Sequence, residues 1–125
     1  MEMQESGEMY LETILILSQE NNMVRSIDVA DRMGFSKPAV SRAMAKLKEG
    51  HYTIIDKDGY IAFTEAGRKI ADKIYERHTM LTTFLTRTGV DEETAAADAC
   101  RIEHVISDKT FEAMKRHNAA HPVKD

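Results

Sequence analysis

The chain is poor in three residue types: it has one cysteine, two prolines and no tryptophan among 125 residues. A single cysteine, Cys100, excludes an internal disulfide framework and is typical of a reducing cytoplasm. The longest uncharged apolar run, Ile14–Leu17, is four residues long, whereas a membrane helix needs about 20, and the first residues lack the layout of a signal peptide. We therefore expect a cytoplasmic protein of one domain or two small lobes, with no membrane partner and an aliphatic core.

The formal net charge of −4 argues against a nucleic-acid partner, but the charges are unevenly distributed along the chain. Residues 1–20 hold five acidic residues and no basic one, residues 32–49 hold five basic residues and one acidic one, and residues 91–104 are acidic again. A basic middle segment between acidic ends indicates that the segments have different functions. The acidic ends also predict that DNA affinity stays poor until something neutralises or repositions them.

Apolar residues at helical spacing predict three helices in the first half of the chain: residues 6–19, 27–33 and 37–49. Ser26 is expected to cap the second helix, and Gly34 to end it in a left-handed conformation. Ser36 caps the third helix, with Pro38 in its first turn, where the missing N–H costs nothing. Gly50 ends this third helix.

The pattern changes after residue 50, where runs rich in β-branched and aromatic residues flank Asp56-Lys57-Asp58-Gly59. An Asp-Gly step between such runs predicts a β-hairpin. Thr64 is then expected to cap a long helix, residues 65–87. Asp91 is expected to cap a helix at about 92–106, and Ser107 or Asp108 a last one at about 108–117. These last helices carry more apolar surface than one small core can cover, so part of it is expected at a dimer interface.

Three helices followed by a hairpin form the layout of a winged helix-turn-helix, which places its third helix in the major groove. The predicted fold is therefore mostly α, with a winged helix-turn-helix DNA-binding domain over residues 1–64 and an all-helical lobe over residues 65–125. Lysine and arginine neutralise phosphates, arginine also reads guanine, and serine and the helix N-terminus bind phosphate oxygens. The candidate DNA contacts are Ser36, Lys37, Pro38, Ala39, Ser41, Arg42 and Lys46. The same charges could also form an ordinary solvated helix face.

Cys100, Glu103 and His104 have the spacing i, i+3, i+4, which places them on one face of a helix. Thiolate, carboxylate and imidazole are all donors for first-row metals. Three donors are too few for a closed site, so others must come from elsewhere in the chain. The further candidates are His78 on the long helix and Met9 and Glu12 on the first helix. A core cysteine, a surface Glu–His pair and a packing methionine are the alternative interpretation of the same residues.

Three segments carry a family resemblance: Glu8–Ile14, Ser36–Ser41 and Ala99–Asp108. They resemble the opening helix, the recognition helix and the dimerisation lobe of the diphtheria toxin repressor family, and the Cys-Arg-x-Glu-His-x-x-Ser-Asp string is the most specific part. The resemblance implies a homodimeric repressor of metal homeostasis genes. Such a protein binds near-palindromic double-stranded operator DNA when iron(II) or manganese(II) is loaded, and it has no small-molecule substrate.

The resemblance also implies a ligand set, which is a hybrid between two branches of the family. The iron-type branch uses methionine and cysteine where the manganese-type branch uses aspartate and glutamate. The residues that match ligand positions are Met9, Glu12, His78, Cys100, Glu103 and His104, with Glu12 following the manganese-type pattern. Thr82 and Ala96 stand where the iron-type ancillary site has glutamate and histidine, so the resemblance does not extend to a full second site of that kind. The chain ends at Asp125, which implies a short form without the third, barrel-like domain.

Donor softness predicts the metal. Thioether and thiolate donors favour Fe(II), Co(II), Ni(II) or Zn(II) over Mn(II), and availability in the cell decides among these. We expect Fe(II), with Mn(II) next, and Zn(II), Co(II) or Ni(II) as substitutes in vitro. A metal-independent winged-helix regulator is the alternative function. A small metalloenzyme is disfavoured because the sequence has no nucleophile–base pair and no glycine-rich phosphate loop. We therefore expect a regulator rather than an enzyme.

Overall fold

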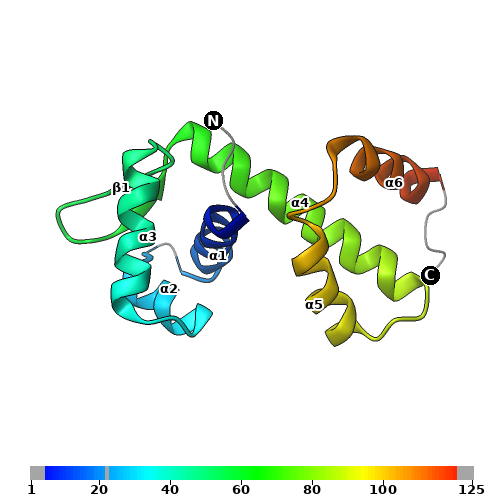
Figure 1. Ribbon diagram of the computed structural model, residues 1–125, viewed down its shortest axis with the longest axis horizontal. Coiled ribbons are helices and arrows are strands. Elements are labelled where there is room, and N and C mark those ends of the chain that lie inside the picture. The colour runs from blue at the N-terminus through cyan, green and yellow to red at the C-terminus, as the bar shows by residue number, and fades with distance from the viewer. Residues whose placement is uncertain (1–4, 22, 121–125) are drawn as a thin grey trace. The chain divides into compact units, whose positions relative to one another are not determined.

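The computed structural model describes residues 5–21 and 23–120 and confirms a mostly α fold with a winged helix-turn-helix followed by a helical lobe. Figure 1 shows the order of its elements, which the colours follow from blue to red. The elements are α1 (Glu5–Glu20), α2 (Ser26–Met33), α3 (Lys37–Glu49), β1 (Thr53–Ile55), β2 (Ile61–Phe63), α4 (Glu65–Arg87), α5 (Glu92–Ile102) and α6 (Asp108–Ala120). The chain forms two compact units that divide between Lys73 and Ile74, inside α4. No helix among the described residues is long and apolar enough to cross a membrane.

The first unit encloses an aliphatic core between α1, α2 and α3. Each of the three helices contributes one buried apolar face to this core. The buried side chains of these helices include Tyr10, Leu11, Ile14, Leu15, Val29, Ala30, Val40, Met44 and Leu47. Because α1 packs on both α2 and α3, the position of α1 determines how the first unit holds its third helix.

The turn between α2 and α3 has the expected geometry, whereas the start of α2 differs from the prediction. Gly34 takes a left-handed φ of 70°, and the hydroxyl of Ser36 accepts a hydrogen bond from the N–H of Ala39 at 3.3 Å. The prediction that Ser26 caps α2 was wrong, since α2 begins at Ser26 and Arg25 is the capping residue. The carboxylate of Asp28 reaches back to accept from the N–H of Arg25 at 2.9 Å, which satisfies this end of the helix instead.

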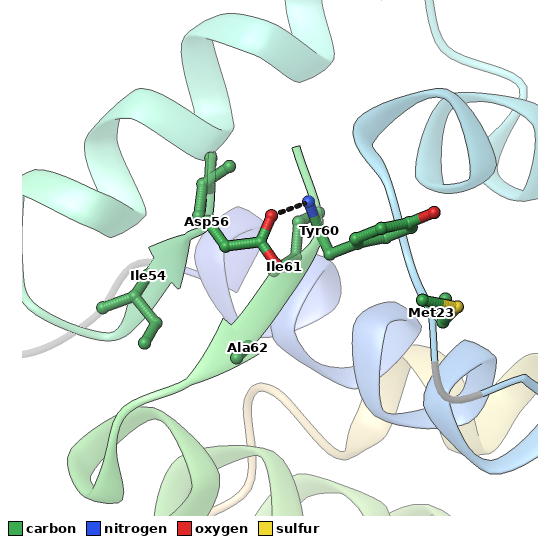
Figure 2. Close-up of a pocket in the computed structure, with 7 residues that line it drawn as sticks. Met23, Ile54, Asp56, Tyr60, Ile61 and Ala62 are labelled. Atoms are coloured by element: carbon green, nitrogen blue, oxygen red, sulfur yellow. Dashed lines mark hydrogen bonds between the residues drawn. The ribbon is translucent and has the colours of Figure 1, made fainter. Parts of the chain in front are cut away.

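The predicted hairpin is present as two short antiparallel strands, with Thr53 opposite Phe63. The carboxylate of Asp56 stabilises its turn, accepting from the N–H groups of Asp58 at 2.9 Å and Tyr60 at 3.0 Å. Figure 2 shows the bond to Tyr60 beside an open hollow of about 310 Å³. Met23, Ile54, Ile55, Asp56, Tyr60, Ile61 and Ala62 line this hollow.

The hairpin packs closely against the first turn of α4. Thr64 caps α4 as predicted, its hydroxyl accepting from the N–H of Gly67 at 3.1 Å. A Cβ atom on Gly67 would lie 1.9 Å from the carbonyl oxygen of Tyr52. Only glycine allows this approach, so Gly67 sets how near the hairpin comes to α4.

The second unit contains the end of α4, α5 and α6. Asp91 caps α5 as expected, its carboxylate accepting from the N–H of Thr94 at 2.9 Å. The prediction that this helix continues to about residue 106 was wrong, because α5 ends at Ile102 and a turn follows. The buried guanidinium of Arg77 donates hydrogen bonds to the carbonyls of Glu103 and Ile106. These carbonyls are therefore satisfied although the helix does not continue. The last helix extends to Ala120, three residues beyond the predicted end.

Candidate metal centre and nucleic-acid interface

Three of the predicted donors meet where α5 ends, inside the second unit. The ligand atoms of Cys100, Glu103 and His104 all lie within 4.8 Å of one another. Glu103 follows the last residue of α5 but keeps helical backbone angles, with φ −57° and ψ −25°. The i, i+3, i+4 spacing therefore still gathers the three side chains on one face, although the helix is shorter than predicted.

Glu103 lies between two imidazoles. Its Oε2 atom is 2.9 Å from Nδ1 of His78, and its Oε1 atom is 3.3 Å from Nε2 of His104. The side chain of Glu103 is 0% exposed, and a carboxylate so fully removed from water requires polar or charged partners. The long helix α4 thus brings His78 to the Cys100, Glu103 and His104 cluster.

The chemistry of these donors fits a divalent first-row metal ion. A thiol, a carboxylate and two imidazoles are ligands that Fe(II), Mn(II), Co(II) and Zn(II) accept in proteins. No other cluster of three or more such donors occurs among the described residues. At the two positions that match the ancillary site, the hydroxyl of Thr82 donates to the carbonyl of His78 at 2.7 Å, and the side chain of Ala96 offers no metal ligand.

The other two predicted ligands belong to the first unit. Met9 and Glu12 are three residues apart on α1, so they share a face of that helix. Glu12 is only 6% exposed and Met9 is half-buried. Their assignment as ligands, like that of the four donors in the second unit, stays a prediction.

The predicted DNA contacts lie on an exposed helix face. On α3, Lys37, Arg42 and Lys46 are exposed, whereas Val40 and Met44 on the opposite side enter the core. Within the described part of the chain, none of the three basic side chains is paired with an acidic one. The remaining candidates Ser36, Pro38 and Ser41 are exposed and Ala39 is half-buried.

The hydroxyl of Ser36 is the one candidate that the fold already uses, because it caps α3. The helix N-terminus behind it presents backbone N–H groups, which suit a phosphate oxygen. Basic side chains that have no acidic partner among the described residues, on a helix that begins with a capped N-terminus, have the composition that phosphate binding needs.

The fold and the donor cluster define the class of protein: a winged-helix regulator with a metal-type donor cluster in a second helical unit. Two family descriptions match the chain, the "iron dependent repressor, N-terminal DNA binding domain" over residues 2–61 and the "iron dependent repressor, metal binding and dimerisation domain" over residues 64–124. The chain belongs to this iron-dependent repressor family, the family of the diphtheria toxin repressor, whose members are metal-dependent transcriptional regulators and not enzymes.

Individual relatives agree with this placement. The chain is 34% identical over 115 residues to the HTH-type transcriptional regulator MJ0568 of Methanocaldococcus jannaschii. This alignment covers 90% of this chain and 92% of the relative. It is 34% identical over 102 residues to the HTH-type transcriptional regulator MntR of Geobacillus kaustophilus, covering 82% of this chain and 72% of the relative.

Among solved structures, the manganese regulator SloR superposes with a TM-score of 0.81 at 26% sequence identity, covering 98% of this chain and 56% of SloR. The chain thus spans about half the length of such solved relatives.

Proposed function

We propose that this protein is a repressor that binds operator DNA as a homodimer when Fe(II) occupies the donor cluster of the second unit. The observation that carries the proposal is the convergence of Cys100, Glu103 and His104 within 4.8 Å, in a chain of a metal-dependent regulator family. His78, through its contact with Glu103, is the fourth donor from this unit. Met9 and Glu12 on α1 complete the proposed ligand set.

The metal preference follows from the donors. Affinity for a given nitrogen, oxygen and sulfur site rises from Mn(II) to Fe(II), and thiolate and thioether donors are softer than the carboxylates that manganese favours. Cys100 and Met9 therefore favour Fe(II). Mn(II) is the second candidate, since SloR, with a similar fold, is a manganese regulator. Zn(II), Co(II) and Ni(II) are expected to bind in vitro.

The positive charge of a bound metal ion explains how metal binding affects the DNA-binding unit. A bound divalent ion supplies positive charge that offsets the repulsion between the donors and the acidic first helix. Met9 and Glu12 then hold α1 in one position. Because α1 shares its core with α2 and α3, a fixed α1 also fixes where α3 presents its basic face. Coupling of this kind is typically about 1–3 kcal/mol.

The DNA contacts are proposed for α3. Lys37 and Lys46 bind phosphates, and Arg42 binds a phosphate or a guanine edge. Ser36, Pro38, Ala39 and Ser41 lie against the sugar–phosphate backbone at the N-terminal end of the helix. Two copies of α3 must reach successive major grooves, about 34 Å apart, so a homodimer and a near-palindromic operator follow. The dimer contact is proposed for apolar residues of the second unit, such as Val105, which is exposed here.

The first test is a metal titration. Anaerobic apo-protein is titrated with Fe(II) and with Mn(II) in a calorimeter, beside a Cys100→Ser variant. We expect tighter binding of Fe(II), and weaker Fe(II) binding in the variant. Equal affinity of wild type and variant would remove Cys100 from the site, and a preference for Mn(II) would assign the protein to manganese instead.

The second test links metal to DNA. His104→Ala should remove the metal-dependent gain in operator affinity while the protein remains a folded dimer, and His117→Ala, at an exposed position on α6, serves as the matched control. Operator affinity that rises with metal in His104→Ala as in wild type contradicts the site. Wild-type operator affinity that a chelator leaves unchanged supports the metal-independent alternative.

A further inference from the structure

Arg77 is a buried cation that immediately precedes the proposed ligand His78 on α4. It is only 5% exposed. A guanidinium removed from water is costly unless its N–H groups find acceptors. The donor cluster and the DNA-facing helix give this residue no role, so its burial requires a separate explanation.

Within the described part of the chain, the hydrogen bonds of the Arg77 guanidinium all fall on one short stretch, residues 103–108. Nη1 donates to the carbonyl of Glu103 at 3.0 Å and to the carbonyl of Ile106 at 3.1 Å, and Nη2 donates to the carboxylate of Asp108. The guanidinium carbon also lies 5.3 Å from the ring centroid of Phe111. The stretch from 103 to 108 contains the ligands Glu103 and His104 and the turn that follows them.

Two consecutive residues of α4 therefore hold Glu103 in different ways. His78 contacts its side-chain carboxylate at 2.9 Å, whereas Arg77 holds its main chain by donating a hydrogen bond to its carbonyl oxygen. We propose that Arg77 is a positioning residue of the metal centre, which fixes the main chain of residues 103–107 so that Glu103 and His104 present their donor atoms together. This inference rests on the proposed function, because it requires that the cluster binds a metal.

The turn needs such a support because α5 has ended. Beyond Ile102 the carbonyls of Glu103 and Ile106 have no helical N–H opposite them, and Arg77 supplies both hydrogen bonds from one nitrogen. Without these bonds two carbonyls would lose their donor, and a carbonyl left unpaired away from water is costly. The turn would then relax, and the entropy cost of ordering Glu103 and His104 would weaken metal binding.

Arginine suits this position better than lysine. Its planar fork can bond two carbonyls and a carboxylate while its face lies on an aromatic ring, whereas an ammonium group is a compact point charge. The partner Asp108 has a side chain that is 69% exposed, so water competes for it. The two carbonyl bonds are therefore expected to matter more than the ion pair.

The test compares Arg77→Lys with Lys115→Met. Lys115 also ties α6 to α4, through Glu76 at 3.1 Å, and Glu76 is the direct neighbour of Arg77. Full-length apo-proteins are titrated anaerobically with Fe(II) and Mn(II), their unfolding is followed in urea, and the visible absorption of the Co(II)-saturated proteins is recorded. The Co(II) spectrum reports ligand geometry in protein that is already folded and loaded, which a general loss of stability would not alter.

We expect Arg77→Lys to weaken metal binding by about tenfold or more, as loss of groups that orient ligands does, and to change the Co(II) spectrum. Lys115→Met should match wild type in both readouts. Wild-type affinity and spectrum in Arg77→Lys would overturn the role of Arg77. Wild-type protein that binds none of the three metals would overturn the proposed function, and this inference with it.

Asp108→Asn provides the second variant should Arg77→Lys fail to fold. It removes the charge that orients the guanidinium but leaves both carbonyl bonds possible. We expect a loss of metal affinity of about threefold, the size expected for a partly exposed ion pair. Unchanged affinity in Asp108→Asn, in protein that is folded, would count against the role of Arg77.

Discussion

Nδ1 of His78 lies 2.9 Å from Oε2 of Glu103, although the two residues are 25 positions apart in the chain. The contact joins the long helix α4 to the turn after α5, so two elements of the second unit share the carboxylate at the centre of the proposed metal site.

The negative charge of Glu103 should matter more than its shape. Glu103→Gln keeps the size of the side chain and can still hydrogen-bond to His78, but it cannot offer an anionic donor. We expect metal affinity to fall at least about tenfold, as expected when a charge-assisted contact is lost, with little change in urea unfolding. Glu112→Gln, at an exposed position of α6, is the control. Equal metal affinity in wild type and Glu103→Gln would remove Glu103 from the ligand set.

Gly67→Ala should destabilise the first unit. The added Cβ would lie 1.9 Å from the carbonyl oxygen of Tyr52, and because that neighbour is main chain, the hairpin itself must shift. The expected loss is about 1–3 kcal/mol of unfolding free energy, typical of overpacking, measured by urea denaturation. Lys69→Ala, exposed on the same helix, should stay within about 0.5 kcal/mol of wild type. A Gly67→Ala variant as stable as wild type would show that the approach is not required.

Asp91 makes the start of α5 sensitive to acid. The N–H of Thr94, which donates to its carboxylate, holds the pKa of Asp91 below its usual value. A folded-state pKa below the unfolded one contributes stability that is present above the unfolded pKa, about 4, and is lost as pH falls through the folded pKa.

Asp91→Asn keeps a capping acceptor but does not titrate there. The stability difference between wild type and variant should therefore shrink below about pH 4, followed by urea unfolding at several pH values. A difference that stays constant across this range would show that the cap does not depend on the charge.

Arg42 should contribute more to operator affinity than the β1–β2 hairpin, which is the wing of this fold. Arg42→Ala is expected to lower the operator affinity of metal-loaded protein by about 1–3 kcal/mol if the side chain reads a base, measured by fluorescence anisotropy at fixed salt. Lys57→Ala, at the tip of the hairpin beside Asp56 and Asp58, should have a smaller effect because that tip is nearly neutral. Arg42→Lys separates the roles, since it retains a phosphate contact but not bidentate guanine recognition. A larger loss for Lys57→Ala would move the main contact to the wing.

Local sequence signals predicted the elements of this protein well where one residue controls a helix end. Gly34, Ser36, Thr64 and Asp91 each act at the predicted position, because capping depends on neighbours within three or four residues. The cap of α2 failed because an acceptor three residues into the helix, Asp28, competed with Ser26.

The sequence alone determined the fold class and the residue types of the candidate site. Helical period, the Asp-Gly turn and the spacing of Cys100, Glu103 and His104 are local properties of the chain, so they can be read without coordinates. Tertiary structure alone decided what depends on contacts between distant segments. It ended α5 at Ile102, brought His78 to Glu103, buried Arg77 against the following turn and required glycine at position 67. Each of these depends on which groups meet after packing, and no local pattern in the chain encodes that meeting.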